Sequence, residues 1–492
     1  MHPPPYDDEC TMRLSPGKMR NRLASKIVQK DWNYVIERTV KCPGEASEWV
    51  EVNFRGSIEK LLPLHVACCL DPPVDAVQAL LKADSEAILL QDANGRLPLH
   101  LACDVNRASP EVIEVLLEAH PEGSEVKENQ FGFLPLHAAC CKSDNAKTCI
   151  DTQQKVIEKL LSAFPSAITE TDGRGWLPLA LACRTGAHPN VIEILLKEKP
   201  SAAKVIDRDL RMPIHLALCS RPGGNEATEI ARMLIDAYPS SLMRQEKKFG
   251  FLPLHVACSF CGLSSSNILV RTLLAAYPEA SQVPDRRGSL PLHLACRAGA
   301  PFSVIQQLVS VYPRGAFHKD DESRLPLHWA CHLNLPAESI HIILDTYPMA
   351  ARIAETKYKF LPLHVACLRG ASKEIIDILL QAYPDGSSCR DKKGCLPLHV
   401  ACMANCDVST EAIESIIKAF PQALAEKDST DATPLDIAKE GDKHDKKEII
   451  QVLLEYLSTE SESDVPDISL VNQENEIIKP TTKRPILRHM SW

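Results

Sequence analysis

Long apolar runs are missing from this chain of 492 residues. No stretch approaches the roughly 18 consecutive apolar residues that a membrane-spanning helix needs, so we expect no membrane partner. Residues 1–8 have neither the basic start nor the apolar stretch of a secretory signal. We therefore expect an intracellular protein, either cytoplasmic or nuclear.

An excess of positive charge is missing as well. The chain has 55 Lys and Arg against 64 Asp and Glu, a net charge of −9 at pH 7. This balance argues against a general nucleic-acid-binding role. The sequence also lacks a phosphate-cradling glycine loop and a Gly-x-Ser-x-Gly nucleophile turn. We expect no catalytic residues, no cofactor and no enzyme activity.

One seven-residue phrase recurs eleven times, from Leu62-Pro63-Leu64-His65-Val66-Ala67-Cys68 to a degenerate copy that starts at Thr433. Its prolines lie at 63, 98, 135, 178, 213, 253, 291, 326, 362, 397 and 434. Similarity at a period of about 35 residues indicates a solenoid, in which each unit buries its apolar face against its neighbours. Such a stack presents a long surface rather than a reaction pocket.

Each unit has two predicted helices and a turn. Proline suits the first position of a helix, and Leu398, Ala401 and Cys402 then lie on one apolar face. A second apolar helix ends at an aromatic-proline pair such as Tyr383-Pro384, because the residue before proline is pushed out of the α region. A turn often follows, with Asp and Gly placed as in Asp391 and Gly394.

This pattern of Asp-x-x-Gly-x-x-Pro-Leu-His with two helices resembles the ankyrin-repeat family over about four-fifths of the chain. The resemblance implies an all-α solenoid of stacked helix-turn-helix units joined by short β-hairpin turns. The family threonine before the proline is kept only at Thr433; leucine replaces it in nine units, and Met212 in another. Losing a hydroxyl N-cap costs about 1 kcal/mol. We expect the leucines to offset this loss by burial between adjacent units.

The ends of the array differ from its middle. Residues 32–40 resemble a second helix without a proper first helix, so residues 20–55 are predicted to form an N-terminal capping unit. The ankyrin-type array of about eleven repeats is then expected over 56–457, with disordered tails at 1–19 and 458–492. Long gaps at 142–155 and 220–227 predict surface loops. The N-terminal segment also matches the Pro-Pro-x-Tyr ligand motif of WW domains, through Pro3, Pro4, Pro5 and Tyr6.

Histidines and cysteines recur in register. Nine aligned histidines sit mostly three residues before a cysteine, which raises the possibility of zinc. Neighbouring helices pack about 8–10 Å apart, so successive pairs form a ladder rather than a tetrahedral site. The ankyrin resemblance implies instead that the histidine hydrogen-bonds turn backbone and ties adjacent units together; Ala180 and Asp436 break this column. Nine aligned cysteines serve as small buried hydrophobes. We expect no metal site.

Variation at the hairpin tip, two residues before each phrase proline, is the feature most relevant to function. Aromatic and arginine side chains dominate the position, and both are enriched in binding hot spots. The predicted partner-binding residues are Arg96, Phe133, Trp176, Arg211, Phe251, Arg324 and Phe360. Phe131, Phe249 and Tyr358, two residues before three of these, extend the stripe. The alternative is that these rings pack on the adjacent hairpin; both can hold together.

The function predicted from these features is that of a non-enzymatic interaction scaffold or regulator. It binds a protein partner through its concave face and hairpin edge. One alternative is a redox- or metal-responsive sensor that uses the less regular cysteines: Cys69, Cys141, Cys149, Cys261, Cys389, Cys395 and Cys406. A second alternative is nucleic-acid binding through basic hairpins, which contain Arg208, Lys247, Lys248, Arg286, Arg287, Lys319, Arg390, Lys392 and Lys393. An acidic peptide partner would also suit these hairpins.

Overall fold

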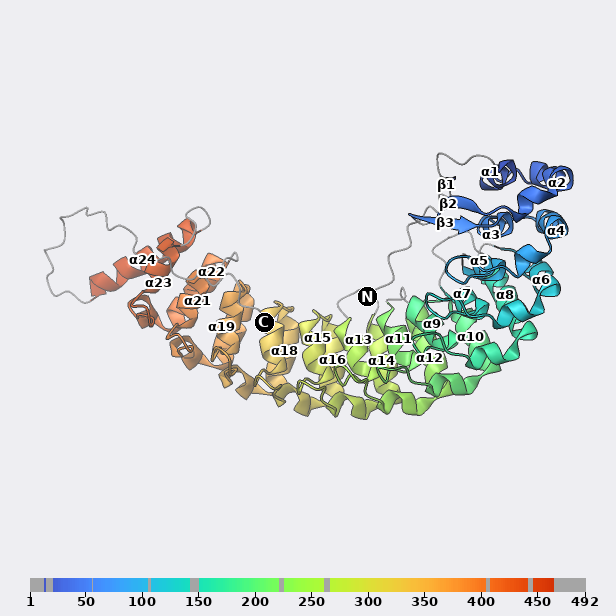
Figure 1. The fold of residues 1–492 in the computed structure, drawn as a ribbon. Coiled ribbons are helices and arrows are strands. Elements are labelled where there is room, and N and C mark those ends of the chain that lie inside the picture. The colour runs from blue at the N-terminus through green and yellow to red at the C-terminus, as the bar shows by residue number, and fades with distance from the viewer. Residues whose placement is uncertain are drawn as a thin grey trace.

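Pairs of antiparallel helices stack in register along one curved axis (Figure 1). The structure is a computed structural model, and it describes residues 13–14, 21–54, 56–104, 108–141, 150–220, 225–260, 266–403, 408–440 and 446–463. Each helix packs mainly on the equivalent helix of the next unit, as α13 does on α15 and α20 on α22. The predicted all-α solenoid is confirmed.

The first helix of each unit begins at the phrase proline and lines the concave side of the arc (Figure 1). These inner helices are α3 (Pro63–Cys68), α5 (Pro98–Asp104), α7 (Pro135–Ala139), α9 (Pro178–Thr185), α11 (Pro213–Cys219), α13 (Pro253–Ser259), α15 (Pro291–Arg297), α17 (Pro326–His332), α19 (Pro362–Leu368), α21 (Pro397–Met403) and α23 (Pro434–Glu440). In α3 to α21 the side chains are almost entirely buried, so these inner helices contribute mainly to the core, whereas α23 exposes Asp436, Lys439 and Glu440.

The second helix of each unit lies on the convex side. These outer helices are α4 (Val74–Ala83), α6 (Pro110–Ala119), α8 (Ile150–Ala163), α10 (Pro189–Glu198), α12 (Asn225–Ala237), α14 (Ser266–Ala276), α16 (Phe302–Val311), α18 (Ala337–Thr346), α20 (Lys373–Ala382), α22 (Thr410–Ala419) and α24 (Lys447–Ser463). Part of the extra sequence at 142–155 and 220–227 lengthens the outer helix: α8 has 14 residues and α12 has 13, whereas α20 has 10. The rest of those gaps, 142–149 and 221–224, lies outside the described residues.

Aromatic-proline pairs end α8, α12, α14, α16, α18, α20 and α22, as predicted, whereas α6 and α10 end at His120-Pro121 and Lys199-Pro200. At Tyr383, for example, the backbone leaves the helix at φ −150° and ψ 86°. A 3₁₀ turn, which begins at the proline, follows each pair and leads to the next hairpin. These turns are η2 (Glu86–Ile88), η3 (Pro121–Glu125), η4 (Pro165–Thr169), η5 (Pro200–Lys204), η6 (Pro239–Met243), η7 (Pro278–Gln282), η8 (Pro313–Phe317), η9 (Pro348–Arg352), η10 (Pro384–Ser388) and η11 (Pro421–Leu424), of which η2 alone lacks a proline.

The N-terminal end corrects one expectation. A first helix does exist there: α1 (Arg22–Val28) precedes α2 (Trp32–Lys41), and the pair stacks on α3 and α4 like a further unit. Asn21 caps α1, because its Oδ1 accepts the N–H of Ala24 at 2.9 Å. The helix was missed because it lacks the proline-containing phrase.

Extended strands, within the described residues, lie at the same end. After η1 (Pro43–Ser47), β2 (Val50–Phe54) pairs antiparallel with β3 (Ser57–Leu61), and β1 (Arg13–Leu14) pairs with the other edge of β2. Later hairpins are shorter and are closed by single residue pairs rather than ladders. At the other end, α24 continues to Ser463, past the predicted array boundary at 457. Residues 1–12 and 464–492, including Pro3–Tyr6, lie outside the described part.

Candidate partner-binding edge

Most hairpins are built around one aspartate. In the hairpin at 172–176, Asp172 Oδ1 accepts the N–H of Arg174 at 2.8 Å and that of Trp176 at 2.7 Å. The Asp172 N–H donates in turn to the Trp176 carbonyl at 2.9 Å, and Gly175 takes the left-handed conformation at φ 82°. The same bonds recur from Asp92, Asp207, Asp285, Asp320, Asp391 and Asp428. The predicted Asx-type turn is confirmed.

A second kind of hairpin is one residue longer and uses glutamate. Glu246 Oε1 accepts the N–H groups of Phe249 and Phe251 at 2.5 and 3.2 Å, while Oε2 accepts that of Lys248 at 2.6 Å. The extra methylene of glutamate reaches around the longer loop. Glu128 and Glu355 cap their hairpins in the same way. Sequence reasoning missed this class, although the signal was present: each glutamate precedes two aromatic residues.

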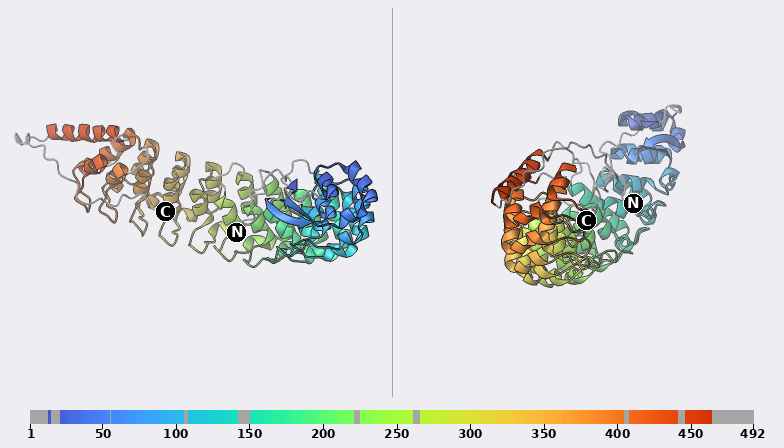
Figure 2. Two further views of the ribbon diagram at one scale, coloured as in Figure 1. Left: turned by 45° about the horizontal axis from the view of Figure 1, so that its top comes forward. Right: turned by 90° about the vertical axis from the view of Figure 1, so that its left-hand side faces the viewer.

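Neighbouring hairpins are joined tip to tip by main-chain hydrogen bonds. The Arg286 N–H donates to the Phe249 carbonyl at 2.9 Å, and the Lys392 N–H donates to the Tyr358 carbonyl at 2.8 Å. Equivalent bonds link 94 to 129, 131 to 173, 209 to 247, 287 to 321, 322 to 356 and 393 to 429. Between the hairpins at 172–176 and 207–211, the Trp176 indole N–H instead donates to Asp207 Oδ2 at 2.9 Å. The tips therefore form one nearly continuous edge, visible as the row of loops in Figure 2.

The predicted tip residues pack largely onto that edge. Phe133, Phe251 and Phe360 stack on the histidines four residues later, His137, His255 and His364, with ring centroids 5.6–5.8 Å apart. Trp176 is only 7% exposed, and Phe360 only 2%. Packing on the adjacent hairpin, the alternative considered above, is seen for Trp176, which contacts Asp207 and Arg211, whereas the three phenylalanines stack on the histidine of their own unit. This burial does not test partner binding, but it restricts the area that these rings can offer.

The arginines of the set are paired. Arg96 binds Asp92 at 2.7 Å and also Glu59. Arg211 binds Asp207 at 2.8 Å and Asp209 at 3.1 Å. Arg324 is 5% exposed, pairs with Glu322 and lies 5.0 Å from the Trp329 ring centroid. Arg297 lies near the same ring, at 5.6 Å. Sequence reasoning did not single out Trp329, which replaces a smaller aliphatic residue of the phrase.

The aromatic residues one step closer to the tip are better placed to contact a partner. Phe249 is 40% exposed, and Phe131 and Tyr358 are half-buried. Each has a cation over its ring: Arg174 at 5.4 Å from Phe131, Lys248 at 4.6 Å from Phe249 and Lys357 at 4.8 Å from Tyr358. All three belong to the glutamate hairpins, which precede every third unit. Partner binding at the hairpin edge stays a prediction, and these residues extend it outward.

The histidine column ties the units together, as the resemblance implied. His293 Nδ1 accepts the Leu290 N–H at 3.1 Å, and its Nε2–H donates to the Arg324 carbonyl of the next hairpin at 3.2 Å. Burial lowers the pKa of His65, His137, His215, His255, His328 and His364 to about 4, and that of His293 to about 3. The rings are therefore neutral structural groups. Within the described ranges, no group of three or more His, Cys, Asp or Glu side chains is placed to hold a metal ion.

The cysteines fall into two groups. The aligned ones are buried, and burial raises the pKa of Cys68 and Cys402 to about 12. Of the less regular cysteines, Cys69 and Cys395 are buried, while Cys141 and Cys389 are half-buried. Cys149, Cys261 and Cys406 lie outside the described residues. Burial also raises the pKa of Cys395 to about 12, which opposes thiolate chemistry at this site.

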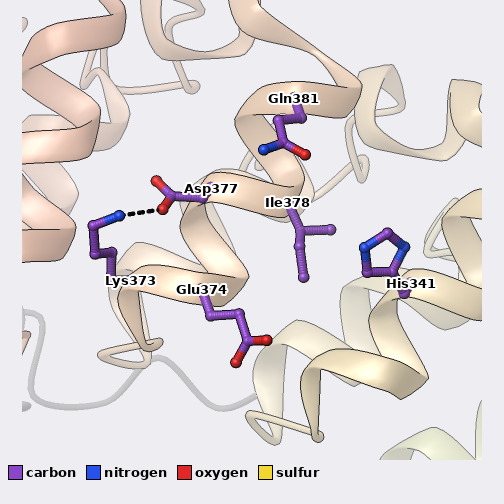
Figure 3. Close-up of a pocket in the computed structure, with 6 residues that line it drawn as sticks. All are labelled: His341, Lys373, Glu374, Asp377, Ile378 and Gln381. Atoms are coloured by element: carbon purple, nitrogen blue, oxygen red, sulfur yellow. Dashed lines mark hydrogen bonds and ion pairs between the residues drawn. The ribbon is translucent and has the colours of Figure 1, made fainter.

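A shallow depression on the convex face lies between α18 and α20 (Figure 3). It is lined by His341, Lys373, Glu374, Asp377, Ile378 and Gln381. Lys373 pairs with Asp377 one helical turn away at 2.5 Å, and His341 faces Asp345 in the same way at 3.6 Å. Such pairs are typical of a solvated helix surface. The depression offers no enclosed site for a reaction.

Comparison with known proteins agrees with this geometry. The family model described as ankyrin repeats (3 copies) matches residues 64–152, 292–390 and 363–465, together more than half of the chain. The chain belongs to the ankyrin-repeat family. Its repeats extend beyond the matched segments, since the same helix pairs and hairpins fill residues 178–290. Along the described residues, no helix of this ankyrin-repeat protein is both long and apolar enough to cross a bilayer.

Two curated proteins share parts of the sequence. The probable 26S proteasome regulatory subunit p28 of Saccharomyces cerevisiae is 26% identical over 239 residues, which are 48% of this chain and 79% of p28. The glycerophosphocholine phosphodiesterase GDE1 of Candida albicans is 30% identical over 122 residues, which are 25% of this chain. The match spans only 9% of the length of the phosphodiesterase.

Proposed function

We propose that this ankyrin-repeat protein is a non-enzymatic scaffold or regulator that binds a protein partner through its concave face and hairpin edge. The carrying observation is the main-chain bonding of successive tips, for example Arg286 to Phe249 and Lys392 to Tyr358. A tip held on both sides loses little freedom on binding, so many modest contacts can add up. The exposed ring of Phe249 lies on this prearranged edge.

The relatives support this proposal in a limited way. The name of p28 describes a regulatory subunit, which fits a protein that acts by binding. Its partners are not carried over, because variable surface positions rather than the repeat framework select a ligand. GDE1 shares too small a part of its length for its activity to bear on this chain.

Site-specific crosslinking in cells tests the proposal. A photoreactive phenylalanine analogue replaces Phe249 on the edge in one protein and Gln381 on the convex face in the other; both side chains are exposed. We expect a defined protein adduct from position 249 and none, or only scattered products, from 381. Equal adduct patterns at the two positions would show that the hairpin edge is not the binding surface.

Alanine variants of Phe131, Phe249 and Tyr358 complete the test. These rings are less buried than Trp176 and Phe360, so their removal should leave the thermal unfolding midpoint nearly unchanged while the adduct is lost. A triple variant of Trp176, Phe251 and Phe360 is a less clean choice, because it also removes stacking inside the edge. Retention of the same adduct in the first triple variant would exclude these aromatic residues as contacts.

A further inference from the structure

Four exposed cationic residues, two from each hairpin, and one exposed ring lie where the hairpins at 246–251 and 285–289 are hydrogen-bonded to each other. Lys247, Lys248, Arg286 and Arg287 are all exposed, and the central ring is Phe249. Lys248 Nζ lies 4.6 Å from the ring centroid. The bond from the Arg286 N–H to the Phe249 carbonyl fixes the second hairpin beside the first. These five residues form the first basic patch.

The same arrangement recurs three units later. Tyr358 is half-buried in the hairpin at 355–360; Lys359 of that hairpin and Lys392 and Lys393 of the next are exposed. The Lys392 N–H donates to the Tyr358 carbonyl at 2.8 Å, as Arg286 does to Phe249. These four residues form the second basic patch. With units about 10 Å apart, the two patches are separated by about 30 Å.

The cations of the first patch are not neutralised within the described part of the chain. Lys247, Lys248, Arg286 and Arg287 make no ion pair with a carboxylate there. Some other cations of the edge are paired, Lys127 with Glu170 at 2.9 Å and Lys427 with Asp431 at 3.1 Å, whereas Arg208 and Lys319 are isolated cations without an ion pair among the described residues. Clustered like charges repel one another, and an anionic ligand removes that repulsion while gaining contacts. What distinguishes the first patch is that four exposed cations without an ion pair lie in two bonded hairpins beside an exposed aromatic ring, where they can pair with the carboxylates of a ligand.

An acidic hairpin separates the patches. Asp321 and Glu322 are exposed at the tip of the hairpin at 320–324, and Glu322 pairs with Arg324. A continuous polyphosphate chain would meet these carboxylates midway, and the net charge of −9 repels it further. Two discrete anionic segments with a neutral stretch between them avoid the obstacle. This observation favours an acidic polypeptide over a nucleic acid.

We propose that each basic patch binds an extended acidic peptide segment whose carboxylates pair with the cations and whose apolar side chain packs on Phe249 or Tyr358. A partner with two such segments occupies both patches at once. The inference rests on the proposed function and deepens it by naming the partner chemistry. Bivalent attachment gives high avidity from weak single contacts, provided the linker spans the separation.

Fluorescence anisotropy with the full-length protein tests this directly. The single probe is a fluorescein-labelled peptide of alternating Asp and Glu around one central Phe. The tandem probe joins two copies by a Gly-Ser linker long enough to span about 30 Å. We expect the tandem probe to bind on the order of 10²-fold more tightly than the single probe, and both affinities to fall as salt is raised. A probe with Asn and Gln in place of the acids should not bind.

Two charge-matched variants locate the binding. Changing Lys247, Lys248, Arg286 and Arg287 to Ser should reduce tandem binding to the level of the single probe. The control changes Lys127, Lys204, Lys427 and Lys439 to Ser, which removes equal charge from exposed positions outside both patches. It should bind the tandem probe nearly as the unchanged protein does. Thermal unfolding midpoints should stay similar in both variants because all eight side chains are exposed.

Three results would overturn the inference. Equal loss of affinity in both variants would indicate non-specific charge attraction. Tighter binding of a single-stranded DNA oligonucleotide than of the tandem peptide, with the same sensitivity to the patch variant, would assign the patches to nucleic acid. Failure of both acidic probes, together with a defined protein adduct from position 249, would sink this partner chemistry while leaving the proposed scaffold function intact.

Discussion

Internal units and the last unit begin their inner helices with different chemistry. In an internal unit such as that of α15, Leu290 is fully buried and the N–H of this residue donates to His293 Nδ1 at 3.1 Å. In the last unit, Thr433 Oγ1 accepts the Asp436 N–H at 3.2 Å, and Asp436 Oδ2 accepts the Thr433 N–H at 3.0 Å. In the internal unit, one of the two bonds of a capping box is made, and its groups are buried. In the last unit, both reciprocal bonds of a capping box are made at the surface.

The difference follows from having a neighbour. The far nitrogen of His293 donates to the carbonyl of Arg324 in the following hairpin, so the ring satisfies two units at once. Within the described residues, no further hairpin follows the helix pair of α23 and α24, and a histidine in α23 would have no such carbonyl to bind there. A polar Thr–Asp pair closes the helix without that requirement, which is what a terminal unit needs.

Acidification should give the largest difference in stability between the internal units and the last unit. The pKa of the internal histidines is lowered from 6.5 to about 4 in the folded state. Between these values the unfolded state binds more protons, so stability falls as pH drops through this window, by roughly 1.4 kcal/mol per pH unit for each such histidine. Urea unfolding between pH 7 and pH 4 measures the slope.

The last unit should resist that change. The Thr433 N–H lowers the pKa of Asp436 below 3.8, so its contribution begins to be lost only as pH falls below that value. At pH 5, hydrogen exchange should therefore show loss of protection in the internal units before it shows loss of protection at the cap of α23. Loss of the α23 cap first would contradict the assignment of acid sensitivity to the histidines.

Removing the capping side chain should cost more inside the array than at its end. We expect His293→Ala to destabilise by about 2–4 kcal/mol, because it leaves a cavity and an unsatisfied Leu290 N–H. Asp436→Ala should cost about 1 kcal/mol, as an exposed capping group does. Hydrogen exchange of the flanking helices measures both locally. Equal costs would refute the distinction.

Exchanging the residue before proline is the reciprocal test. Leu290→Thr should lose about 1–2 kcal/mol, because the lost burial exceeds the gain from a hydroxyl cap. Thr433→Leu should also lose about 1 kcal/mol, since the site is only half-buried. A gain in the urea midpoint for Leu290→Thr would show that burial does not offset the missing N-cap.

Relief of backbone strain in the hairpins should give the smallest change in stability, and the change should be a gain in both internal and terminal hairpins. Lys359 has φ 58° where the equivalent Gly132 and Gly250 have 72° and 73°. Lys359→Gly should stabilise by about 0.5–1 kcal/mol. Asp431→Gly, in the last hairpin, should gain less because aspartate tolerates φ 64° better and pairs with Lys427. Thermal unfolding of both variants checks this order, and destabilisation by Lys359→Gly would rule strain out.

Local signals in the sequence predicted the units themselves. The phrase proline marks where the inner helices from α3 to α23 begin, an aromatic-proline pair marks where most outer helices end, and Asp with Gly marks many of the turns. These are short-range rules, so they hold wherever the residues occur. They failed at α1, which begins after Asn21 without the phrase, and they overlooked the longer hairpins of Glu128, Glu246 and Glu355, where glutamate replaces aspartate.

By itself, the sequence determined that the chain is a tandem array with its apolar faces buried between units, because periodicity fixes which side chains share a face. Only the tertiary structure decided what the tip residues touch. Trp176 turns its indole N–H to Asp207, Phe360 stacks on His364, and Lys248 and Arg286 meet beside Phe249. The first and last of these relations join hairpins that are about 35 residues apart in the chain, and only the rise and rotation between stacked units bring those hairpins together.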